Sequence, residues 1–283
     1  MEKVRIAVVG VRGLGRSHIR GILENSDVAE LVAICDILPD ILKTRGDEFG
    51  VPEDKRYLDF YEMIKVGGFD CVILVTPDQV HAEHAVAALE AGYHVLCEKP
   101  LSGDASDEAL IDAAAKKAGK WVMIGYQWSY STAINALKED ILAGAYGKPV
   151  FLKTIVLWPR AEKYFKRGSG WAGKIKADDG TLIYDSVAAN ATAHYIHNML
   201  YVCGEKNLAA EPLDVKADLI RVNPIENFDN IALSFSLECG AKCLFIAAHS
   251  CNEEHSPVFE YRFEKATITY DEETKNLVAH LDD

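Results

Sequence analysis

Short apolar runs and segments of helical periodicity alternate over the first 125 residues. Runs of β-branched and aliphatic residues predict strands over Val4 to Val9, Leu31 to Cys35, Cys71 to Val75, Val95 to Cys97 and Trp121 to Ile124. Apolar spacing predicts helices over Val80 to Ala91 and Asp104 to Ala118, the second capped by Ser102 or Asp104. Repeated βα units predict an α/β domain over residues 1–125 with a doubly wound parallel sheet.

After Gly147-Lys148-Pro149 the pattern changes to an alternation of period two. The alternating stretches are Val150 to Leu157, Ala217 to Val222, Asn230 to Leu237, Lys242 to Ser250 and Phe259 to Tyr270. One helix is predicted from about Ser186 to Val202. Residues 126–283 therefore read as an α+β domain with a mostly antiparallel open sheet. The segment from Trp158 to Gly180 is the longest irregular stretch, and loops of that length are usually functional or disordered.

Composition and charge fit two soluble domains. The chain has 283 residues, of which 49% are hydrophobic, and no apolar run approaches the ~18 residues that span a bilayer. Its formal net charge is −13 and it has no basic run, so we expect neither nucleic acid nor an anionic membrane as a partner. A cytoplasmic location is expected, and any anionic ligand must be drawn by local groups.

The cysteines indicate reduced thiols rather than a disulfide framework. There are seven, an odd number, and several fall in apolar runs. One cluster, with Cys239, Cys243, His249, Cys251 and His255 within 17 residues, has the ligand types of a zinc site. The Cys239-Gly240 segment reads instead as a turn between two strands and lacks the C-x-x-C spacing, so no metal is expected.

A glycine-rich turn follows the first predicted strand, with the sequence Gly10-Val11-Arg12-Gly13-Leu14-Gly15. Glycines at such a turn allow a tight bend and let the backbone N–H groups at the start of a helix face a pyrophosphate. The fingerprint departs from G-x-G-x-x-G because Arg12 occupies the second glycine position and Gly13 follows it. A dinucleotide site is predicted here.

Asp36 ends the second predicted strand, 21 residues after Gly15. A carboxylate at that place accepts the hydroxyl groups of an adenosine ribose and repels a 2′-phosphate, which favours NAD over NADP. Arg12 leaves NADP open, because a guanidinium near the turn pairs with a phosphate of either cofactor. The alternative for Asp36 is a cap or turn residue.

Lys99 lies between Glu98 and Pro100 where an apolar run ends. Proline cannot continue a central strand and restricts the residue before it, so Lys99 is expected where the chain leaves the sheet at its carboxyl edge. Open α/β sheets bind ligands at that edge. The alternative is a surface lysine in an ordinary loop.

These motifs together resemble the Gfo/Idh/MocA family of oxidoreductases, named after glucose-fructose oxidoreductase, inositol dehydrogenase and a rhizopine catabolism protein. The resemblance spans nearly the whole chain. It rests on the glycine turn with His18, on Thr76-Pro77 followed by His81, on Glu98-Lys99-Pro100, and on Gly180 to His194.

The resemblance implies a cofactor site, a substrate domain and an oligomer. The implied cofactor-binding residues are Gly10, Arg12, Gly13, Leu14, Gly15, Asp36, Thr76, Pro77, His81, Glu98, Lys99 and Gln127. Lys99 would contact both the nicotinamide ribose and the substrate, with a cis peptide before Pro100. Residues 126–283 would bind the substrate, and their sheet would form a homodimer or homotetramer. Because the chain is shorter than most of the family, a C-terminus that lacks final strands or a helix is expected.

The family's second catalytic pair is an acid and a histidine one helical turn apart, and here the sequence departs from it. His194 matches the histidine, but the residue one turn earlier is Asn190, and the nearest upstream acid is Asp185. Either Asn190 replaces the acid, or an insertion leaves Asp185 near the site; Gly180 to Asp185 matches the family's approach to the acid and favours the second. On one helix Asn190, His194 and His197 would share a face, although both histidines could be structural.

The implied chemistry is hydride transfer at a sugar, polyol or sugar-derived acid. His194 would act as the base, Lys99 would stabilise the alkoxide, and Asp185 would orient His194. Candidate substrate-binding residues, chosen for flat or charged side chains, are Lys99, Trp128, Arg160, Tyr164, Trp171, Asn190, His194 and His197. The rival functions are a redox-assisted glycosidase, a non-catalytic NAD-binding sensor and a reductase of an imine or another carbonyl.

Overall fold

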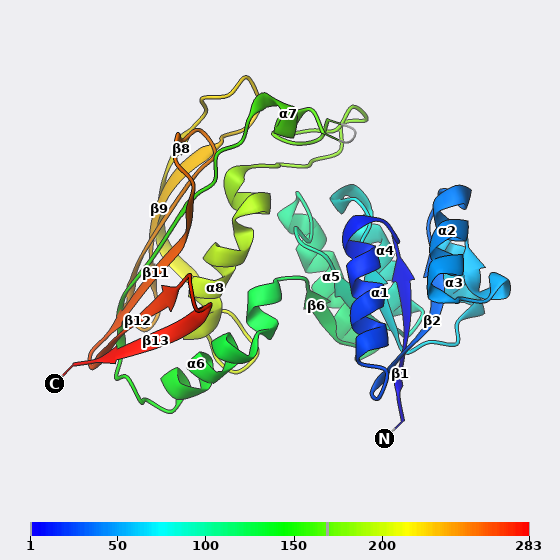
Figure 1. Cartoon of the computed structure of the whole chain (residues 1–283), viewed down its shortest axis with the longest axis horizontal. Coiled ribbons are helices and arrows are strands. Elements are labelled where there is room, and N and C mark those ends of the chain that lie inside the picture. Colours follow the sequence, from blue (N-terminus) through cyan, green and yellow to red (C-terminus); the bar gives the residue numbers. More distant parts are fainter. Residues whose placement is uncertain (1, 168–169, 283) are drawn as a thin grey trace. The chain divides into compact units, whose positions relative to one another are not determined.

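The chain divides into two compact units, Met1–Gly125 and Tyr126–Asp283. The structure, a computed structural model, describes residues 2–167 and 170–282. Each unit is built on one sheet, and the elements of both are drawn in Figure 1.

The first unit is a parallel six-stranded sheet in the order β3-β2-β1-β4-β5-β6. Its strands are β1 (Val4–Val9), β2 (Ala29–Cys35), β3 (Arg56–Tyr57), β4 (Cys71–Leu74), β5 (His94–Cys97) and β6 (Val122–Ile124). Its helices are α1 (Gly13–Glu24), α2 (Pro39–Phe49), α3 (Phe60–Val66), α4 (His81–Glu90) and α5 (Ala105–Ala118), with 3₁₀ turns η1 (Glu53–Lys55) and η2 (Asp78–Val80). This strand order is that of a Rossmann fold, which confirms the predicted fold class.

Each face of this sheet has its own apolar core. Side chains alternate along β1, so Val8 packs with Ile19 of α1 and Leu42 of α2. Ala7 and Val9 point to the opposite face, in the core that includes residues of α3, α4 and α5. The carboxyl ends of the buried strands are thereby fixed from both sides.

The second unit is a seven-stranded sheet in the order β13-β12-β11-β7-β10-β9-β8. Its strands are β7 (Pro149–Leu157), β8 (Pro212–Ile220), β9 (Asn230–Leu237), β10 (Lys242–Ala248), β11 (His255–Phe263), β12 (Ala266–Asp271) and β13 (Asn276–Leu281). Its helical segments are η3 (Gln127–Tyr130), α6 (Thr132–Leu142), α7 (Glu162–Phe165), the π-helical η4 (Val187–Ala191) and α8 (Ala193–Cys203). Among the strands that the structure describes in this sheet, only β7 and β10 pair in parallel, which confirms the mostly antiparallel sheet.

Two details of the predicted second unit were wrong. The stretch from Phe259 to Tyr270 is not one strand. Glu264 and Lys265 separate β11 from β12, because their N–H groups donate to the carbonyls of Lys148 and Tyr146, just before β7. The helix predicted from Ser186 to Val202 is interrupted, because the N–H and the hydroxyl of Thr192 both bond to the carbonyl of Val187. β13 was not predicted.

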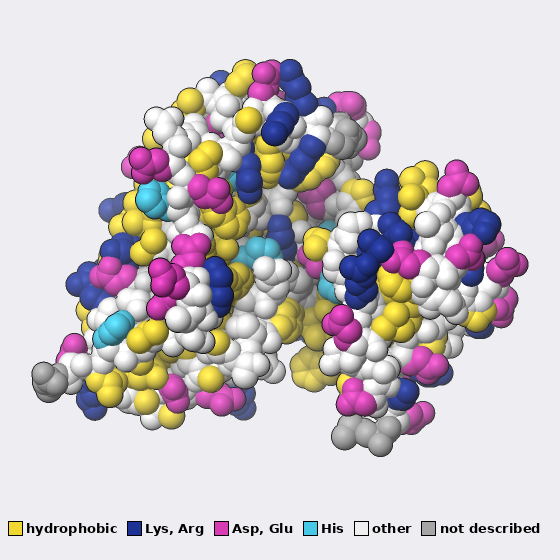
Figure 2. Space-filling view, viewed as in Figure 1, with side chains coloured by type: hydrophobic (Ala, Val, Ile, Leu, Met, Phe, Trp, Pro, Cys, Tyr) yellow, Lys and Arg dark blue, Asp and Glu magenta, His cyan; other side chains and the backbone are white. Residues whose placement is uncertain are grey.

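One face of the second sheet carries the core, and a long segment extends from its end. α6 and α8 contribute Leu137, Met199 and Val202 to the core cluster that includes Leu152 and Phe245 of the sheet. In the segment from Trp158 to Gly180, the described residues form one short helix, α7. In Figure 2, Lys and Arg side chains gather among hydrophobic ones over the region of α7.

Candidate functional site

The glycine turn is closely packed against the sheet. A Cβ on Gly15 would lie 1.8 Å from the carbonyl oxygen of Gly10, and a Cβ on Gly10, whose φ is 83°, would lie 2.4 Å from the carbonyl oxygen of Val75. By contrast, nothing lies within 4 Å of a Cβ built on Gly13. The start of α1 therefore approaches the sheet edge as closely as backbone permits, which suits a pyrophosphate at the helix N-terminus. Leu14 is exposed there.

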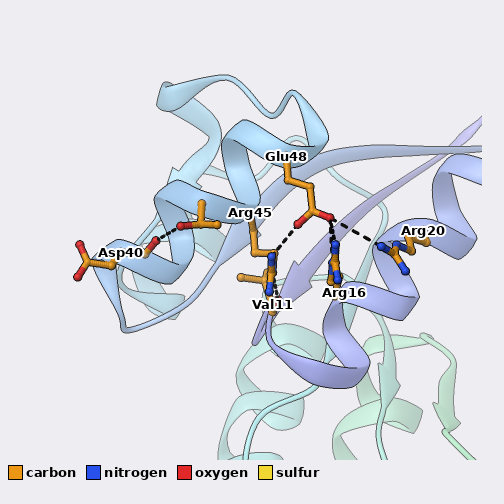
Figure 3. A network of polar contacts seen from close by, with 7 residues as sticks. Val11, Arg16, Arg20, Asp40, Arg45 and Glu48 are labelled. Atoms are coloured by element: carbon orange, nitrogen blue, oxygen red, sulfur yellow. Dashed lines mark hydrogen bonds and ion pairs between the residues drawn. The ribbon is translucent and has the colours of Figure 1, made fainter.

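Side chains from α1 and α2 brace this turn (Figure 3). Arg45 Nε donates to the carbonyl oxygen of Val11 at 3.3 Å, and its Nη1 donates to Glu48 at 2.6 Å. Glu48 also accepts a hydrogen bond from Arg16 Nε at 2.9 Å, and Arg20 lies 3.9 Å away. The Arg16 hydrogen bond, helped by Arg45 and opposed by desolvation, lowers the pKa of Glu48. Sequence reasoning missed this network, for which the only signal is the i,i+3 spacing of Arg45 and Glu48.

Asp36 lies at the carboxyl end of β2 and is 5% exposed. Its Oδ2 accepts the N–H of Val11 and its Oδ1 accepts the N–H of Leu38, both at 3.1 Å. Arg12 Nε lies 3.9 Å from Oδ2. A carboxylate has about four acceptor sites, so this one retains capacity for ribose hydroxyl groups. Asp36 thus joins the turn to β2, whichever cofactor it selects.

Thr76 places a buried hydroxyl group beside the glycine turn. Its hydroxyl oxygen is buried and has no hydrogen-bond partner among the described residues. Thr76 follows β4 next to Gly10, and Pro77 leads into η2. A buried polar atom without a partner costs free energy and asks for an explanation. The orphaned hydroxyl and the glycine cradle fit a dinucleotide at this edge.

Glu98, Lys99 and Pro100 follow β5 at its carboxyl end. His18 Nε2 on α1 donates to Glu98 Oε1 at 2.8 Å, and the Lys99 N–H donates to Glu98 Oε2 at 3.2 Å. Burial alone would raise the pKa of Glu98. His18 and Lys99 lower this pKa below its usual value, His18 through its hydrogen bond and charge and Lys99 through its backbone N–H and charge. A Cβ on Gly125 would lie 2.7 Å from this carboxylate. The direction of the chain at Lys99 is therefore fixed, and the Lys99–Pro100 peptide is cis, as the resemblance implied.

His81 joins the two loops that carry Thr76 and Pro100. It begins α4 and is 2% exposed. Its Nδ1 lies 2.9 Å from the carbonyl oxygen of Pro100, and its Nε2 lies 2.8 Å from that of Thr76. The ring therefore supports both loops through their backbones rather than standing open to solvent.

In the second unit, the two candidates for the acid position, Asp185 and Asn190, are hydrogen-bonded to each other. Asn190 donates its amide to Asp185 Oδ1 at 2.9 Å, and the N–H of Gly173 donates to Oδ2 at 2.6 Å. Asp185 is buried and follows Tyr184, whose φ of 49° is unusual for a residue with a Cβ. Asn190 lies in η4 and His194 in α8, so the predicted straight-helix relation between them was wrong.

His197 follows His194 by three residues in α8 and is buried as a neutral ring. Burial, reinforced by the charge of Lys138, lowers the pKa of His197 to about 4. Tyr126 stacks on it with ring centres 4.0 Å apart, and Ser129 Oγ lies 3.0 Å from its Nδ1. The same Tyr126 ring stands edge-on to His194 at 6.1 Å. These contacts suit a role of the His197 ring in supporting Tyr126 and, through it, His194. The contact of His197 with substrate remains a prediction.

The remaining candidates lie at two different places in the second unit. Gln127 and Trp128 begin η3, and Trp128 packs edge-on against Tyr195, Phe259 and Tyr270. Arg160, Tyr164 and Trp171 occur in the segment after β7, where two arginines approach aromatic rings. The structure thus brings these three near one another and places Trp128 among core rings.

The positions of the cysteines and the turn at Cys239-Gly240 agree with the sequence analysis. Cys239 lies in the turn between β9 and β10, and Cys35, Cys71, Cys97 and Cys243 are buried. Burial raises the pKa of the Cys71 thiol to about 11. No helix in the described part of the chain is long and apolar enough to cross a membrane.

Comparisons with known proteins agree with this geometry. Residues 4–126 match the family model described as "Oxidoreductase family, NAD-binding Rossmann fold", that is, the Gfo/Idh/MocA family. The match covers residues 4–126, less than half of the chain, and shows what this segment is similar to. The match agrees with the Rossmann fold of the first unit, and the description of the family model names NAD as the cofactor that its members bind.

Among its curated relatives are two inositol dehydrogenases. Inositol 2-dehydrogenase of Salmonella paratyphi B is 32% identical over 150 residues, which are 53% of this chain and 44% of the relative. The scyllo-inositol 2-dehydrogenase (NAD(+)) of Bacillus subtilis is 30% identical over 152 residues, 54% of this chain and 44% of the relative. The matched segment thus spans less than half of these relatives.

Solved structures extend the likeness of fold to the second unit. The WlbA dehydrogenase of Bordetella pertussis, solved with NADH and UDP-GlcNAcA, has a TM-score of 0.80 and 24% identity. The match covers 95% of this chain and 78% of that one. At this identity the likeness concerns the fold.

Proposed function

We propose that this chain is an NAD-dependent oxidoreductase that transfers a hydride between nicotinamide and a hydroxyl or carbonyl group of a sugar, polyol or sugar derivative. The observation that carries the proposal is Lys99, held at the carboxyl edge of the parallel sheet by Glu98 and His18. The family of residues 4–126, the two inositol dehydrogenase relatives and the NADH in the WlbA structure support it.

The cofactor would lie along the edge of the first sheet. Gly10, Gly13 and Gly15 would leave room for the pyrophosphate, Asp36 would accept the adenosine ribose, and Thr76 would donate its hydroxyl. When bound, NAD accepts the hydride from a substrate carbon or returns it to a carbonyl. Arg12 lies near enough to Asp36 to keep NADP as a weaker alternative.

The other groups would handle the proton and the charge. Lys99, a cation, would stabilise the negative charge that develops on the reacting oxygen. His194 would accept the hydroxyl proton during oxidation and return it during reduction, because imidazole exchanges a proton readily near neutral pH. Asp185 would hold the segment before α8 in place through Asn190 and Gly173.

The free face of the second sheet supports the predicted homo-oligomer. Phe151 and Ile155 of β7 and Leu244 and Ile246 of β10 are half-buried, alternating with core residues of the same strands. The same face carries the Lys153–Glu260 ion pair, and a mixture of apolar and charged side chains on an open sheet face suits a subunit interface. A dimer or tetramer through this sheet and a cytoplasmic location belong to the proposal.

A screen of NADH formation tests the proposed function. The full chain with NAD is incubated with polyols, sugars, sugar acids and glycosides, and absorbance at the NADH band is followed with product analysis. We expect net NADH formation with at least one member. Hydrolysed glycoside without net NADH would indicate the redox-assisted glycosidase, and NAD binding without conversion of any probe would indicate the sensor.

A further inference from the structure

Two arginines of the second unit share one aromatic ring. The guanidinium carbon of Arg160 lies 5.0 Å from the centre of the Tyr164 ring, and that of Arg167 lies 3.7 Å from it. The two guanidinium carbons are therefore no further apart than the two distances together, about 8.7 Å. Lys166 in the same segment pairs with Glu162, whereas neither guanidinium has a carboxylate within 4.0 Å among the described residues.

Arg160 is held in place by the sheet. The N–H of Trp158 donates to the carbonyl of Ala248 and the N–H of Arg160 to that of His249, so the β7–β10 pairing continues past the strand ends. Arg160 Nε is buried and has no hydrogen-bond partner among the described residues. A buried donor on a charged group is costly when unpaired, which points to a ligand.

The surroundings do not neutralise the two positive charges. His249 is 3% exposed, and burial, with Arg160 and Arg167 adding to it, lowers its pKa against the opposing effects of the Trp158 carbonyl and Asp229. Asp229 accepts hydrogen bonds from Val222, Asn223 and Asn230, so its charge is engaged elsewhere. In a chain of net charge −13 this is a local site of positive potential.

We propose that Arg160, together with Arg167, binds the carboxylate of a sugar acid in the second unit. A guanidinium and a carboxylate form two parallel hydrogen bonds, which the free Nε of Arg160 would complete. Tyr164, Trp158 and Trp171 offer flat faces suited to a sugar ring, and Arg167 already lies 4.8 Å from Trp171. The proposal rests on the proposed function and narrows its substrate class.

Within the second unit, Tyr164 places this cluster close to Asp185. Tyr164 and His249 line a small pocket together with Asp185. Asp185 in turn bonds to Asn190, a few residues before His194. A sugar acid anchored at Arg160 would therefore border the segment that carries the proposed base.

Titration calorimetry on the full chain saturated with NADH tests the site. The probes are glucuronate and glucose, which differ by a carboxylate, and UDP-glucuronate and UDP-glucose, which show whether the acid is recognised free or on a nucleotide. The variants are Arg160→Gln, Arg167→Gln and the control Lys166→Gln, an exposed neighbour paired with Glu162. We expect the acid of at least one pair to bind about 10- to 100-fold tighter than its neutral partner, a preference lost in Arg160→Gln and kept in Lys166→Gln.

Three binding results would overturn the proposal. Equal binding of acid and neutral sugar, or an acid preference that survives both arginine variants, would remove the carboxylate site. If UDP-glucose binds as tightly as UDP-glucuronate and loses affinity in Arg160→Gln, the recognised anion is the diphosphate. NADH formation, measured in parallel, separates the two claims, because neutral sugars oxidised without acid preference refute only this inference, and acid binding without turnover refutes only the proposed function.

Discussion

Gly15 offers the sharpest test of the packing that forms the cofactor edge. In Gly15→Ala the new Cβ would lie 1.8 Å from the Gly10 carbonyl oxygen, so the two backbones must separate by about 1.6 Å to reach an ordinary contact. Gly10 resists this, because its N–H bonds to Cys35 and its own Cα faces the Val75 carbonyl. We expect a loss of about 3 kcal/mol or more in the stability of the first unit, at the upper end of overpacking effects.

The same helix supplies the matched control. A Cβ on Gly21 meets nothing within 4 Å, so Gly21→Ala should stabilise α1 by about 0.5–1 kcal/mol. Urea unfolding followed by hydrogen exchange in β1 and β4 measures both variants, and fluorescence titration measures NAD affinity. Gly15→Ala should bind NAD at least about tenfold more weakly, since α1 is displaced. If Gly15→Ala is as stable as the wild type and binds NAD equally well, the description of this turn is wrong.

Three further predictions concern single side chains. Fluorescence titration should show NAD binding at least about tenfold tighter than NADP, and equal affinities would remove the role given to Asp36. His194→Ala should lower turnover by roughly 10²–10⁴ with NAD affinity unchanged, and His197→Ala should do less; the reverse order would exchange their roles. The pKa of His197 is about 4 in the folded chain and about 6.5 in the unfolded chain. Burial of this ring therefore leaves the free energy of unfolding unchanged above pH 6.5 and lowers it as the pH falls toward 4. Urea unfolding should show up to about 2 kcal/mol more loss between pH 7.5 and 5 in the wild type than in His197→Phe, and parallel curves would contradict this.

The fold could be read from the sequence because local patterns determine it. Buried strands such as Cys71–Leu74 are continuous apolar runs, and strands of the second unit such as β7 alternate with period two because one face is covered by the core. Asp104 was a candidate cap and proves to cap α5, accepting the N–H of Ser106. The turn at Glu264 was not visible, because it depends on hydrogen bonds to residues more than a hundred positions away.

The candidate site was predictable only in its residue types. Lys99 before proline marks a sheet edge in the sequence itself, whereas the support from His18 depends on the packing of α1. The choice between Asp185 and Asn190 could not be made from spacing, because the π-helical η4 and Thr192 interrupt the helix. Arg45 and Glu48 look like an ordinary surface pair until α2 is placed beside the glycine turn.

Lys99→Met tests the central claim most directly, because it keeps the length of the side chain and removes its charge. Stopped-flow absorbance of NADH formation in the full chain, with a substrate found in the screen, separates hydride transfer from product release. We expect hydride transfer to fall by about 10² or more, with NAD affinity only modestly weaker, because a preorganised cation no longer faces the developing alkoxide. Hydride transfer at near wild-type rate would show that Lys99 is structural and that the proposed catalytic site is wrong.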